Sequence, residues 1–444
     1  MQNDTIFALA SAAGRAGIAV LRLSGPGAAT ALAALGCVLP GPRKAVRAHF
    51  KHPVTKNLLD DGLLLWFPAP ASFTGEDVAE LHVHGGRAVV ESVLAALSGI
   101  AGLRPAEPGE FTRRAFEHGK FDLTQAEALA DLIDAETQSQ QRQALRQMGG
   151  ALKELYDDWR HRLVQSLAHL EAVIDFPDED LPQDVADKIW GEVEDLRKSI
   201  AAHLDDGGRG ERVRAGIVAV IIGPPNAGKS TLLNALARRE AAIVSPIPGT
   251  TRDVIEVHMD LGGYAVTLID TAGLRESGDE IENEGIKRAR DNAACADLKI
   301  AVFDGAIYPV RETATMEMID KDTLVVINKS DLVQVASDKV SGKDGNVSFI
   351  SAKSGQGMEA FAARLLQCVR SKTETGATAP LTRIRHRRAL EDCRDALARA
   401  REAALAELAA EDLRFAARAL GRLTGRVDVE ELLDVVFRDF CIGK

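Results

Sequence analysis

One short stretch, GPPNAGKS at residues 223–230, constrains the fold of this chain more than any other feature. It matches the eight-position phosphate-loop pattern, in which backbone N–H groups and a helix N-terminus point at nucleotide phosphates. An apolar run at 217–222 precedes it, and a helical stretch begins at Thr231. A tight glycine turn is the alternative, but the order of strand, loop and helix favours a phosphate loop. We therefore predict a nucleotide-binding α/β unit.

Three further stretches complete the pattern of a guanine-nucleotide site. The apolar run before Asp270 ends in DTAG, which places a carboxylate near Mg²⁺ and a backbone N–H near the terminal phosphate. In NKSD at 328–331, a carboxylate accepts from the guanine N1–H and 2-amino group together, a donor pair that adenine lacks. SAK at 351–353 closes over the base. The predicted GTP-binding residues are Asn226, Ala227, Gly228, Lys229, Ser230, Thr231, Ser245, Pro246, Ile247, Pro248, Gly249, Thr250, Thr251, Asp270, Thr271, Ala272, Gly273, Asn328, Lys329, Ser330, Asp331, Ser351, Ala352 and Lys353.

Length and composition predict a multidomain cytoplasmic protein. A chain of 444 residues is too long for one core and suggests about three domains. No apolar run approaches the roughly 20 residues of a membrane span, and the N-terminus has no basic region before an apolar stretch. Five scattered cysteines argue against a disulfide framework and a zinc site. A net charge of −11 disfavours a protein that coats nucleic acid, but leaves room for a local basic patch at 383–388.

The spacing of apolar residues changes three times along the chain. Short apolar runs broken by Gly and Pro indicate a mixed α+β domain, and apolar residues at three- and four-residue spacing indicate helices from Leu123 to about Leu204. Strands then alternate with helices, which is typical of βαβ units, before a second helical block. A helical domain interrupted by an insertion explains this order. The predicted fold is an α+β domain at 1–117, an all-α helical domain in two parts at 118–213 and 371–444, and an inserted P-loop GTPase α/β domain at 214–370.

Hydrolysis in this predicted domain needs an unusual arrangement. Leu274 stands where small signalling GTPases have a glutamine that orients water. Negative charge developing on the phosphoryl group also needs a cation, and Arg252 and Arg275 are candidate arginine fingers. Asn226 offers another solution, because its amide oxygen and the carbonyls of loop 245–251 are suitable ligands for a hard monovalent cation. The alternative is that Asn226 hydrogen-bonds its own backbone.

Several stretches together resemble the MnmE (TrmE) family of tRNA uridine-34 modification GTPases. They are FTGEDVAELHVHGG, PGEFTRRAFEHGKFDLTQAEALADLIDA, GTTRD and the terminal CIGK, and the resemblance covers essentially the whole chain. It implies an N-terminal domain similar to folate-binding enzymes, a discontinuous helical domain and an inserted GTPase. It also implies a homodimer that forms a heterotetramer with a flavin-dependent partner. That complex installs a carboxymethylaminomethyl or aminomethyl-type group on carbon 5 of the wobble uridine of certain tRNAs, using a tetrahydrofolate-bound one-carbon unit.

The resemblance also implies roles for individual residues. Glu282 matches the acid that orients the attacking water, for which the alternative is an exposed carboxylate on a helix face. The segment between Asp304 and Leu324 is short for the family. The implied ligands are Asn226, Ser245, Ile247 and Thr250 for K⁺, Ser230 and Thr251 for Mg²⁺, and Arg22, Glu80, Lys120 and Lys444 for folate.

Two patterns at the ends of the chain have alternative interpretations. Strand alternation puts Glu80, His82 and His84 on one face, which would suit a metal, although no further close Cys or His is evident. The terminal CIGK has prenylation spacing, but its glycine and final lysine fit that signal badly. The tail is either frayed or completes a pocket in a neighbouring domain.

Two other functions remain open from the sequence. A GTP-driven ribosome-assembly or RNA-binding switch would share the nucleotide motifs, but no RNA-binding module is recognisable. A structural dimerisation scaffold that binds GTP does not explain the acids and cation ligands clustered around the phosphates. Measured folate binding would favour the tRNA-modifying function over the GTP-driven switch and over the dimerisation scaffold.

Overall fold

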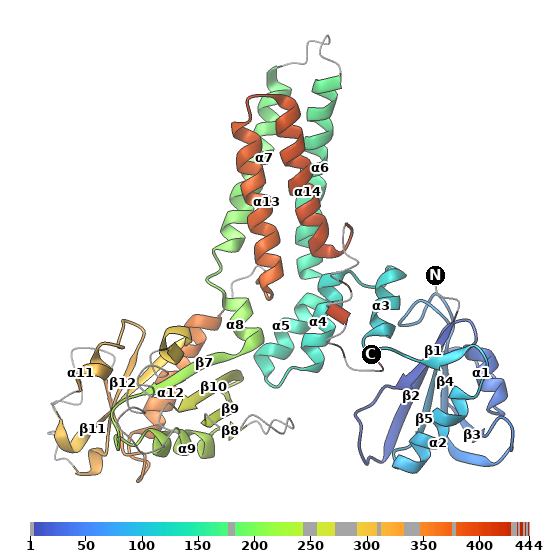
Figure 1. Ribbon diagram of the computed structural model, residues 1–444, viewed down its shortest axis with the longest axis horizontal. Helices are drawn as coiled ribbons and strands as arrows, with labels where there is room; N and C mark the ends of the chain where they lie inside the picture. Colours follow the sequence, from blue (N-terminus) through green and yellow to red (C-terminus); the bar gives the residue numbers. More distant parts are fainter. Residues whose placement is uncertain are drawn as a thin grey trace. The chain divides into compact units, whose positions relative to one another are not determined.

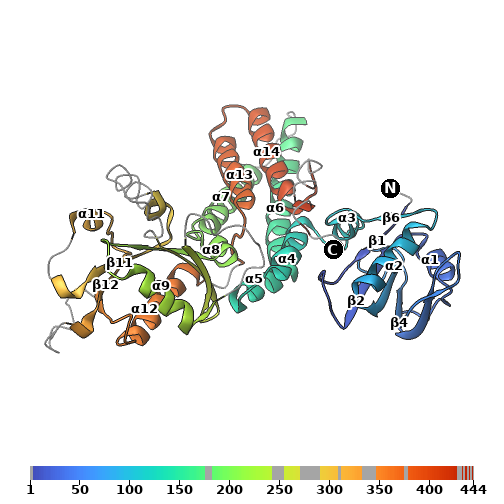
Figure 2. The same ribbon diagram turned by 60° about the horizontal axis from the view of Figure 1, so that its bottom comes forward.

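A computed structural model describes residues 4–175, 183–242, 255–270, 291–308, 312–332, 347–374 and 379–427, with residues 433, 436, 437, 440 and 443. The chain divides into two compact units (Figure 1, Figure 2). The first contains residues 1–130, 148–168 and 413–444, and the second contains residues 131–147 and 169–412.

The first unit is built on a sheet whose described strands follow the order β3-β4-β5-β2-β1-β6. Leu21 of β2 is registered with Leu81 of β5, which in turn is opposite Leu64 of β4, so the three share one face. All three are fully buried under α1 and α2 (Figure 1). The bounds are β1 Thr5–Leu9, β2 Ile18–Ser24, α1 Ala28–Ala34, β3 Val46–Lys51, β4 Leu58–Phe67, β5 Val78–His84, α2 Arg87–Ser98 and β6 Leu103–Pro105.

The opposite face of this sheet has a covered patch that includes the β1 side. There Ile6 and Ala8 pack against Phe111 of α3 (Glu110–Glu117) and against Phe73 of the loop between β4 and β5. Because alternate residues point to opposite faces, Arg22 of β2 and Glu80 of β5 lie on this face beside the covered patch, and both are half-buried.

Helices and the end of the chain complete the first unit. They are most of α4 (Leu123–Ile133), most of α6 (Ala151–Asp175) and most of α14 (Ala406–Thr424). Phe437 and Phe440 pack with Leu123 of α4 in a small apolar core. Gly443 lies so close to β1 that an added Cβ would be 2.1 Å from the Leu9 carbonyl oxygen. Gly443 therefore lies against the N-terminal sheet.

The second unit contains a sheet of βαβ type, with described strands in the order β13-β12-β11-β7-β10-β9-β8. Strand β7 pairs in parallel with β10 and β11, whereas β9 is antiparallel to β10. Residues of α9 and α12 pack in one core with one face of this sheet. The bounds are β7 Ile217–Ile222, α9 Lys229–Arg239, β8 Ala241–Ala242, β9 Ile255–Leu261, β10 Tyr264–Asp270, β11 Leu298–Asp304, η1 Gly305–Ile307, α11 Thr313–Met316, β12 Leu324–Asn328, η2 Ser330–Leu332, β13 Val347–Phe349 and α12 Met358–Thr373.

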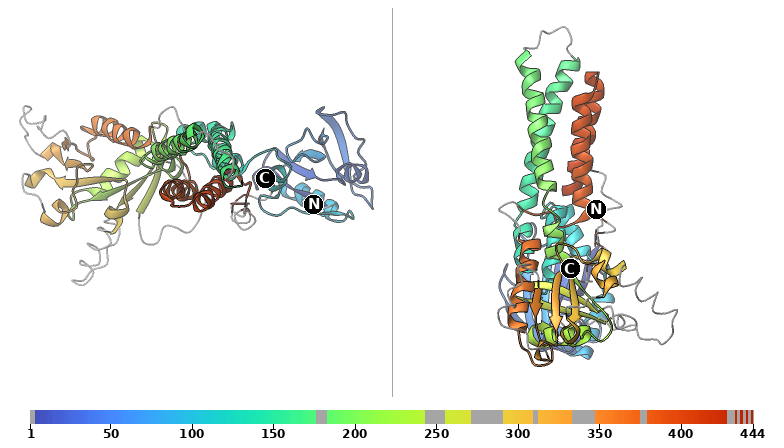
Figure 3. Two further views of the ribbon diagram at one scale, coloured as in Figure 1. Left: turned by 90° about the horizontal axis from the view of Figure 1, so that it is seen from above. Right: turned by 90° about the vertical axis from the view of Figure 1, so that its left-hand side faces the viewer.

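Four further helices lie within the second unit. They are α5 (Gln138–Met148), α7 (Gln183–Leu204), α8 (Arg209–Ala215) and α13 (Ile384–Glu402), of which α7 and α13 lie side by side (Figure 3). The predicted fold class is confirmed, since an α/β sheet is inserted between two helical stretches. In the described part of the chain, no helix is long and apolar enough to cross a membrane. The exact domain limits stay a prediction.

Candidate nucleotide and folate sites

The phosphate loop follows β7 directly and is held in a conformation that only certain residues adopt. Gly228 has φ +94°, and an added Cβ would lie 2.2 Å from the Nδ2 atom of Asn328. Asn226 lies in the left-handed region at φ +62°, which asparagine tolerates better than most residues. Its side chain is exposed and makes no hydrogen bond among the described residues. The alternative in which Asn226 bonds its own backbone therefore finds no support there.

Two side chains at the start of α9 carry the chemistry of the loop. Lys229 is buried, and its amine donates to the carbonyl oxygens of Gly223 at 2.7 Å and Pro224 at 2.9 Å. The ammonium group is thus inside the predicted phosphate cradle. Ser230 Oγ donates to Oδ2 of Asp270 at 2.5 Å, which joins the first turn of α9 to the end of β10. A hydroxyl and a carboxylate oxygen side by side are the donor types that Mg²⁺ prefers.

The predicted base-binding residues are joined to the phosphate loop through Asn328 at the end of β12. Its amide is buried, donating to the Ala227 carbonyl at 2.9 Å and accepting from the Ala352 N–H at 3.0 Å. The phosphate loop, NKSD and SAK therefore meet at the Asn328 side chain, which leaves DTAG as the fourth motif. The Ser330 N–H also donates to the Ile350 carbonyl at 3.0 Å, which fixes the next strand end.

The charged residues of this region have distinct surroundings. Lys329 Nζ lies 2.7 Å from Oδ2 of Asp304. Burial alone raises the pKa of Asp304, but hydrogen bonds from Lys329 and the Ala306 N–H hold it below its usual value. Asp331 and Lys353 are exposed, so their polar groups are open to a ligand. Ser351 is buried, and Thr231 is exposed on the first turn of α9.

Other predicted nucleotide and cation residues lie outside the described residues, and their roles stay predictions. They are Ser245, Pro246, Ile247, Pro248, Gly249, Thr250, Thr251, Thr271, Ala272, Gly273 and Glu282, with the arginine-finger candidates Arg252 and Arg275, Leu274, and the folate candidate Lys444.

Two predicted folate residues form a cross-strand pair on the partly open sheet face. The Nη2 atom of Arg22 lies 2.9 Å from Oε1 of Glu80. The guanidinium also lies over two aromatic rings, 5.3 Å from the centroid of Phe73 and 5.9 Å from that of Phe111. A cation fixed on aromatic faces beside a carboxylate acceptor suits a ligand with a planar ring and an anionic group.

Lys120 contacts the loop between β4 and β5, which carries Phe73 and so borders the Arg22 site. Its amine donates to the Pro70 carbonyl, and the neighbouring Phe121 ring lies 5.6 Å from the ring of Phe73. The loop that carries the aromatic ring over Arg22 is therefore also in contact with the Lys120 segment. The family resemblance implied folate roles for Arg22, Glu80 and Lys120, whereas the sequence analysis did not identify this loop.

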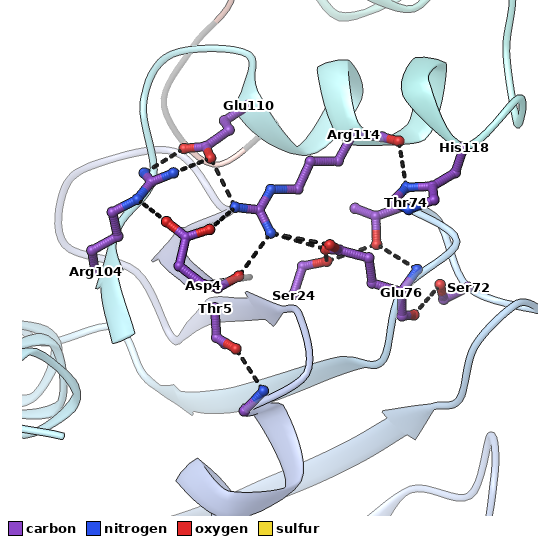
Figure 4. A network of polar contacts seen from close by, with 11 residues as sticks. Asp4, Thr5, Ser24, Ser72, Thr74, Glu76, Arg104, Glu110, Arg114 and His118 are labelled. Carbon is purple, nitrogen blue, oxygen red and sulfur yellow. Dashed lines mark hydrogen bonds and ion pairs between the residues drawn. The ribbon is translucent and has the colours of Figure 1, made fainter. Parts of the chain in front are cut away.

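A buried ionic network anchors the same loop, and the sequence analysis missed it (Figure 4). Arg114 of α3 donates to Asp4 Oδ1 at 2.8 Å, to Glu110 Oε1 at 3.0 Å and to Glu76 Oε1 at 3.1 Å. Glu76 in turn accepts from the Ser24 hydroxyl at 2.6 Å. Burial raises the pKa of Glu110, but hydrogen bonds from Arg104, the Glu107 N–H and Arg114 hold it below its usual value. The signal for this network is weak in sequence, because its members come from five separate segments.

The metal alternative for β5 is not supported by the structure. His82 Nε2 lies 3.6 Å from Glu80 Oε2, while the His84 ring pairs with Asp60 at 2.9 Å. Among the described residues, no group of three or more His, Cys, Asp or Glu side chains is placed to hold a metal ion.

Comparison with known families extends these observations over the whole chain. Residues 5–120 match the model described as the GTP-binding protein TrmE N-terminus, and residues 123–441 match the MnmE helical domain. The chain belongs to the MnmE family. The tRNA modification GTPase MnmE of Paramagnetospirillum magneticum is 59% identical over 444 residues, the full length of both chains. That of Parvibaculum lavamentivorans is 58% identical over 447 residues, covering 99% of this chain and all of that one.

A more distant relative comes from an animal mitochondrion. The 5-taurinomethyluridine-[tRNA] synthase subunit GTPB3 of Danio rerio is 47% identical over 475 residues, covering all of this chain and 93% of that one. The resemblance inferred from the motifs is therefore confirmed for this MnmE-family chain.

The basic run at 383–388 is mostly engaged within this MnmE-family chain, and Arg388 is its exposed arginine. Arg383 pairs with Asp131 at 2.7 Å, Arg387 pairs with Asp206 at 2.7 Å, and His386 is buried. Arg383 and Arg387 therefore connect parts of the second unit through ion pairs.

Proposed function

We propose that this chain is a potassium-stimulated GTPase that acts in tRNA modification. With a flavin-dependent partner, it modifies carbon 5 of the wobble uridine, position 34, to an aminomethyl-type group with a folate-bound one-carbon unit. The observation that carries the proposal is the combination, in one chain, of the Asn328-centred guanine-nucleotide site and both MnmE family domains.

Each nucleotide-site residue has a role that follows from its chemistry. The Lys229 ammonium neutralises charge on the outer phosphates, and Asp331 accepts from the guanine edge. Ser230 and Thr251 would be the Mg²⁺ ligands, and the Asp270 carboxylate beside Ser230 would add negative charge to the metal site. Glu282 orients the attacking water. Magnesium supplies charge stabilisation at the transferring phosphoryl group.

The potassium role of Asn226 rests on its exposed amide, which makes no hydrogen bond among the described residues. Its partners are carbonyl and hydroxyl oxygens of Ser245, Ile247 and Thr250. A cation there replaces an arginine finger, which is worth about 10³–10⁵ in rate. We expect GTP hydrolysis to be much faster in potassium chloride than in sodium chloride at equal ionic strength, and Asn226→Ala to lose the difference. Equal wild-type rates in the two salts would remove the cation role.

The folate role rests on Arg22, which is fixed by Glu80 and two aromatic rings on a partly open face. Arg22 and Lys120 favour the anionic parts of a reduced folate, Glu80 accepts from its pterin, and Lys444 completes the pocket. Calorimetry of the full chain with 5-formyltetrahydrofolate tests this. We expect Arg22→Ala to lose at least tenfold in affinity. Arg47→Ala, which removes an exposed arginine paired with Asp61 on the same sheet, is the matched control.

We further propose a cytoplasmic homodimer joined through the N-terminal domains, which associates with the flavin-dependent partner as a heterotetramer and with tRNA. The partly uncovered face of the N-terminal sheet carries exposed apolar residues, among them Ile18 and Leu63, which favour such contact. Sedimentation that finds only monomer at micromolar concentration would contradict the dimer.

Mass analysis of tRNA wobble uridines tests the proposed function as a whole. Cells that lack this chain should accumulate wobble uridine without the aminomethyl-type group, and the intact gene should restore it. The alternative, a ribosome-assembly or RNA-binding switch, predicts unchanged wobble uridines together with an altered profile of ribosomal subunits. That result would overturn the proposal.

A further inference from the structure

Helix α5 presents amides where a helix of this kind usually presents apolar side chains. Its sequence is QSQQRQALRQM, and Gln140, Gln143 and Gln147 recur at intervals of three and four residues. This spacing places them on one side of the helix together with Ala144, which is buried. Gln147 is also buried, with 2% of its surface exposed. These three residues are termed the glutamine face.

The first two glutamines bind the backbone that leads into the GTPase domain. Gln140 Nε2 donates to the Arg214 carbonyl at 3.1 Å, and Gln143 Nε2 donates to the Gly210 carbonyl at 2.9 Å. Both carbonyls belong to α8, which precedes β7. Residues 205–216 are termed the inbound crossing.

The third glutamine binds the backbone that leads out of the GTPase domain. Gln147 Nε2 donates to the Pro380 carbonyl at 3.3 Å, and its Oε1 accepts from the Thr382 hydroxyl at 3.3 Å. Residues 379–383, which precede α13, are termed the outbound crossing. The two crossings touch, because an added Cβ on Gly210 would lie 2.1 Å from the Leu381 carbonyl oxygen.

A single carboxylate ties the two crossings together beside the glutamine face. Asp131 Oδ1 accepts from Arg214 Nε of the inbound crossing at 2.9 Å and from Arg383 Nη2 of the outbound crossing at 2.7 Å. Farther along, Arg387 of α13 donates to the Leu204 carbonyl at 2.8 Å. The helical domain therefore holds both connections of its insert with charge-assisted bonds as well as amide bonds.

The same helix also contacts a strand, β10, that ends beside the phosphate loop. The Ser139 N–H donates to the Gly263 carbonyl at 3.0 Å, in the turn that begins β10. Strand β10 runs from there to Asp270, in parallel register with β7, which runs from the inbound crossing to the phosphate loop. At about 3.3 Å per residue, each strand is a stiff connection of roughly 20 Å between α5 and the nucleotide end.

We propose that the glutamine face and Asp131 form a joint that couples the nucleotide state of the GTPase domain to the helical domain. Movement at the ends of β7 and β10 shifts the inbound crossing and the β9–β10 turn, both of which are hydrogen-bonded to α5. Amide–carbonyl hydrogen bonds weaken steeply when donor and acceptor move out of line, so a shift of α8 relative to α5 changes their energy. These are positioning residues, and the inference rests on the proposed function.

The test replaces the donors without changing the shape of the helix. In Gln140→Glu/Gln143→Glu, each amide donor becomes an oxygen that faces a carbonyl. The Gln140 oxygen that accepts from the Thr137 N–H at the helix start is retained. Gln138→Glu/Gln141→Glu makes the same charge change on exposed positions of the same helix and is the matched control.

Two readouts in the full chain separate coupling from mere stability. First, the Gln140→Glu/Gln143→Glu variant should hydrolyse GTP within about twofold of wild type and modify at least tenfold less tRNA per GTP hydrolysed. The control should keep the wild-type ratio. An unchanged ratio in the test variant, or a parallel loss of both activities, overturns the inference.

Second, hydrogen exchange compares the α5 and α8 amides with GDP and with a non-hydrolysable GTP analogue. We expect at least a twofold difference in exchange between the two nucleotides in wild type, lost in Gln140→Glu/Gln143→Glu and in Asp131→Asn. Identical exchange in wild type with both nucleotides overturns the inference. The exchange measurement needs no tRNA, so it tests the coupling joint even if the proposed function is wrong. A wild-type protein that fails to modify tRNA would count against the proposed function alone.

Discussion

Replacing Arg114 by methionine should loosen the anchoring of α3 on the N-terminal sheet. The Arg114 side chain is 5% exposed, and it donates to carboxylates from three segments (Figure 4). Methionine keeps most of the apolar stem but removes every one of these donors. Glu110 keeps Arg104 as a partner, whereas Glu76 keeps the Ser24 hydroxyl.

The expected cost follows from the burial of the group. Removing one partner of a buried ion pair costs about 3–5 kcal/mol, and we expect about 3 kcal/mol because Asp4 is partly exposed. That corresponds to roughly 150-fold faster opening of the segment. Arg113, the next residue, forms a partly exposed i,i+4 pair with Glu117, a kind of pair worth about 0.3–0.5 kcal/mol, and Arg113→Met is the matched control.

Native-state hydrogen exchange measures this directly in peptides covering β6 and α3. The difference in opening rate between Arg114→Met and wild type should be largest near pH 7. The folded-state pKa values of Asp4 and Glu110 are depressed, so their contribution is present above their ordinary values of 3.8 and 4.5 and is lost as pH falls through the folded values. If Arg114→Met opens no faster than Arg113→Met, the network does not hold α3 in place.

Three further predictions concern single positions. Gly228→Ala should abolish GTP binding in a nucleotide-binding assay, because its Cβ would lie 2.2 Å from Asn328 Nδ2 at a φ of +94°. Gly191→Ala, in an exposed turn of α7 with open space around it, should raise the free energy of unfolding by about 0.5–1 kcal/mol in urea titration; a loss would contradict the helix geometry. Ser230→Ala should raise the magnesium concentration needed for half-maximal GTP hydrolysis at least tenfold, and an unchanged requirement would remove Ser230 from the metal site.

The nucleotide site was predictable because its signals are local in sequence. Each motif follows a buried strand, and parallel strands bring their carboxyl ends to one edge of the sheet, so Ser230 and Asp270 were expected to meet. The insertion of the domain was also predictable, since two helical textures flank it. The role of Asn328 as the link between the phosphate loop and Ala352 needed the structure, because it depends on side-chain direction.

The anchoring contacts were not predictable, because they join residues far apart in the chain. The spacing of the glutamines on α5 is visible in sequence, but Gln147 and its acceptor Pro380 are 233 positions apart. Arg114 and Asp4 are 110 positions apart. Likewise, the basic run at 383–388 suggested an open patch, and only the fold places Asp131 against Arg383.

The most direct test of the central claim changes which nucleotide supports tRNA modification. In the proposed site Asp331 accepts from the guanine N1–H and 2-amino group, so Asp331→Asn should lose GTP and gain xanthosine triphosphate, whose base carries an oxygen in place of the 2-amino group. Extracts from cells that lack this chain are supplied with wild type or Asp331→Asn and with either nucleotide, and wobble uridines are analysed by mass. We expect modification with GTP only in the wild type and with xanthosine triphosphate only in Asp331→Asn. Modification that is independent of the matching nucleotide would contradict a GTP-driven role in tRNA modification.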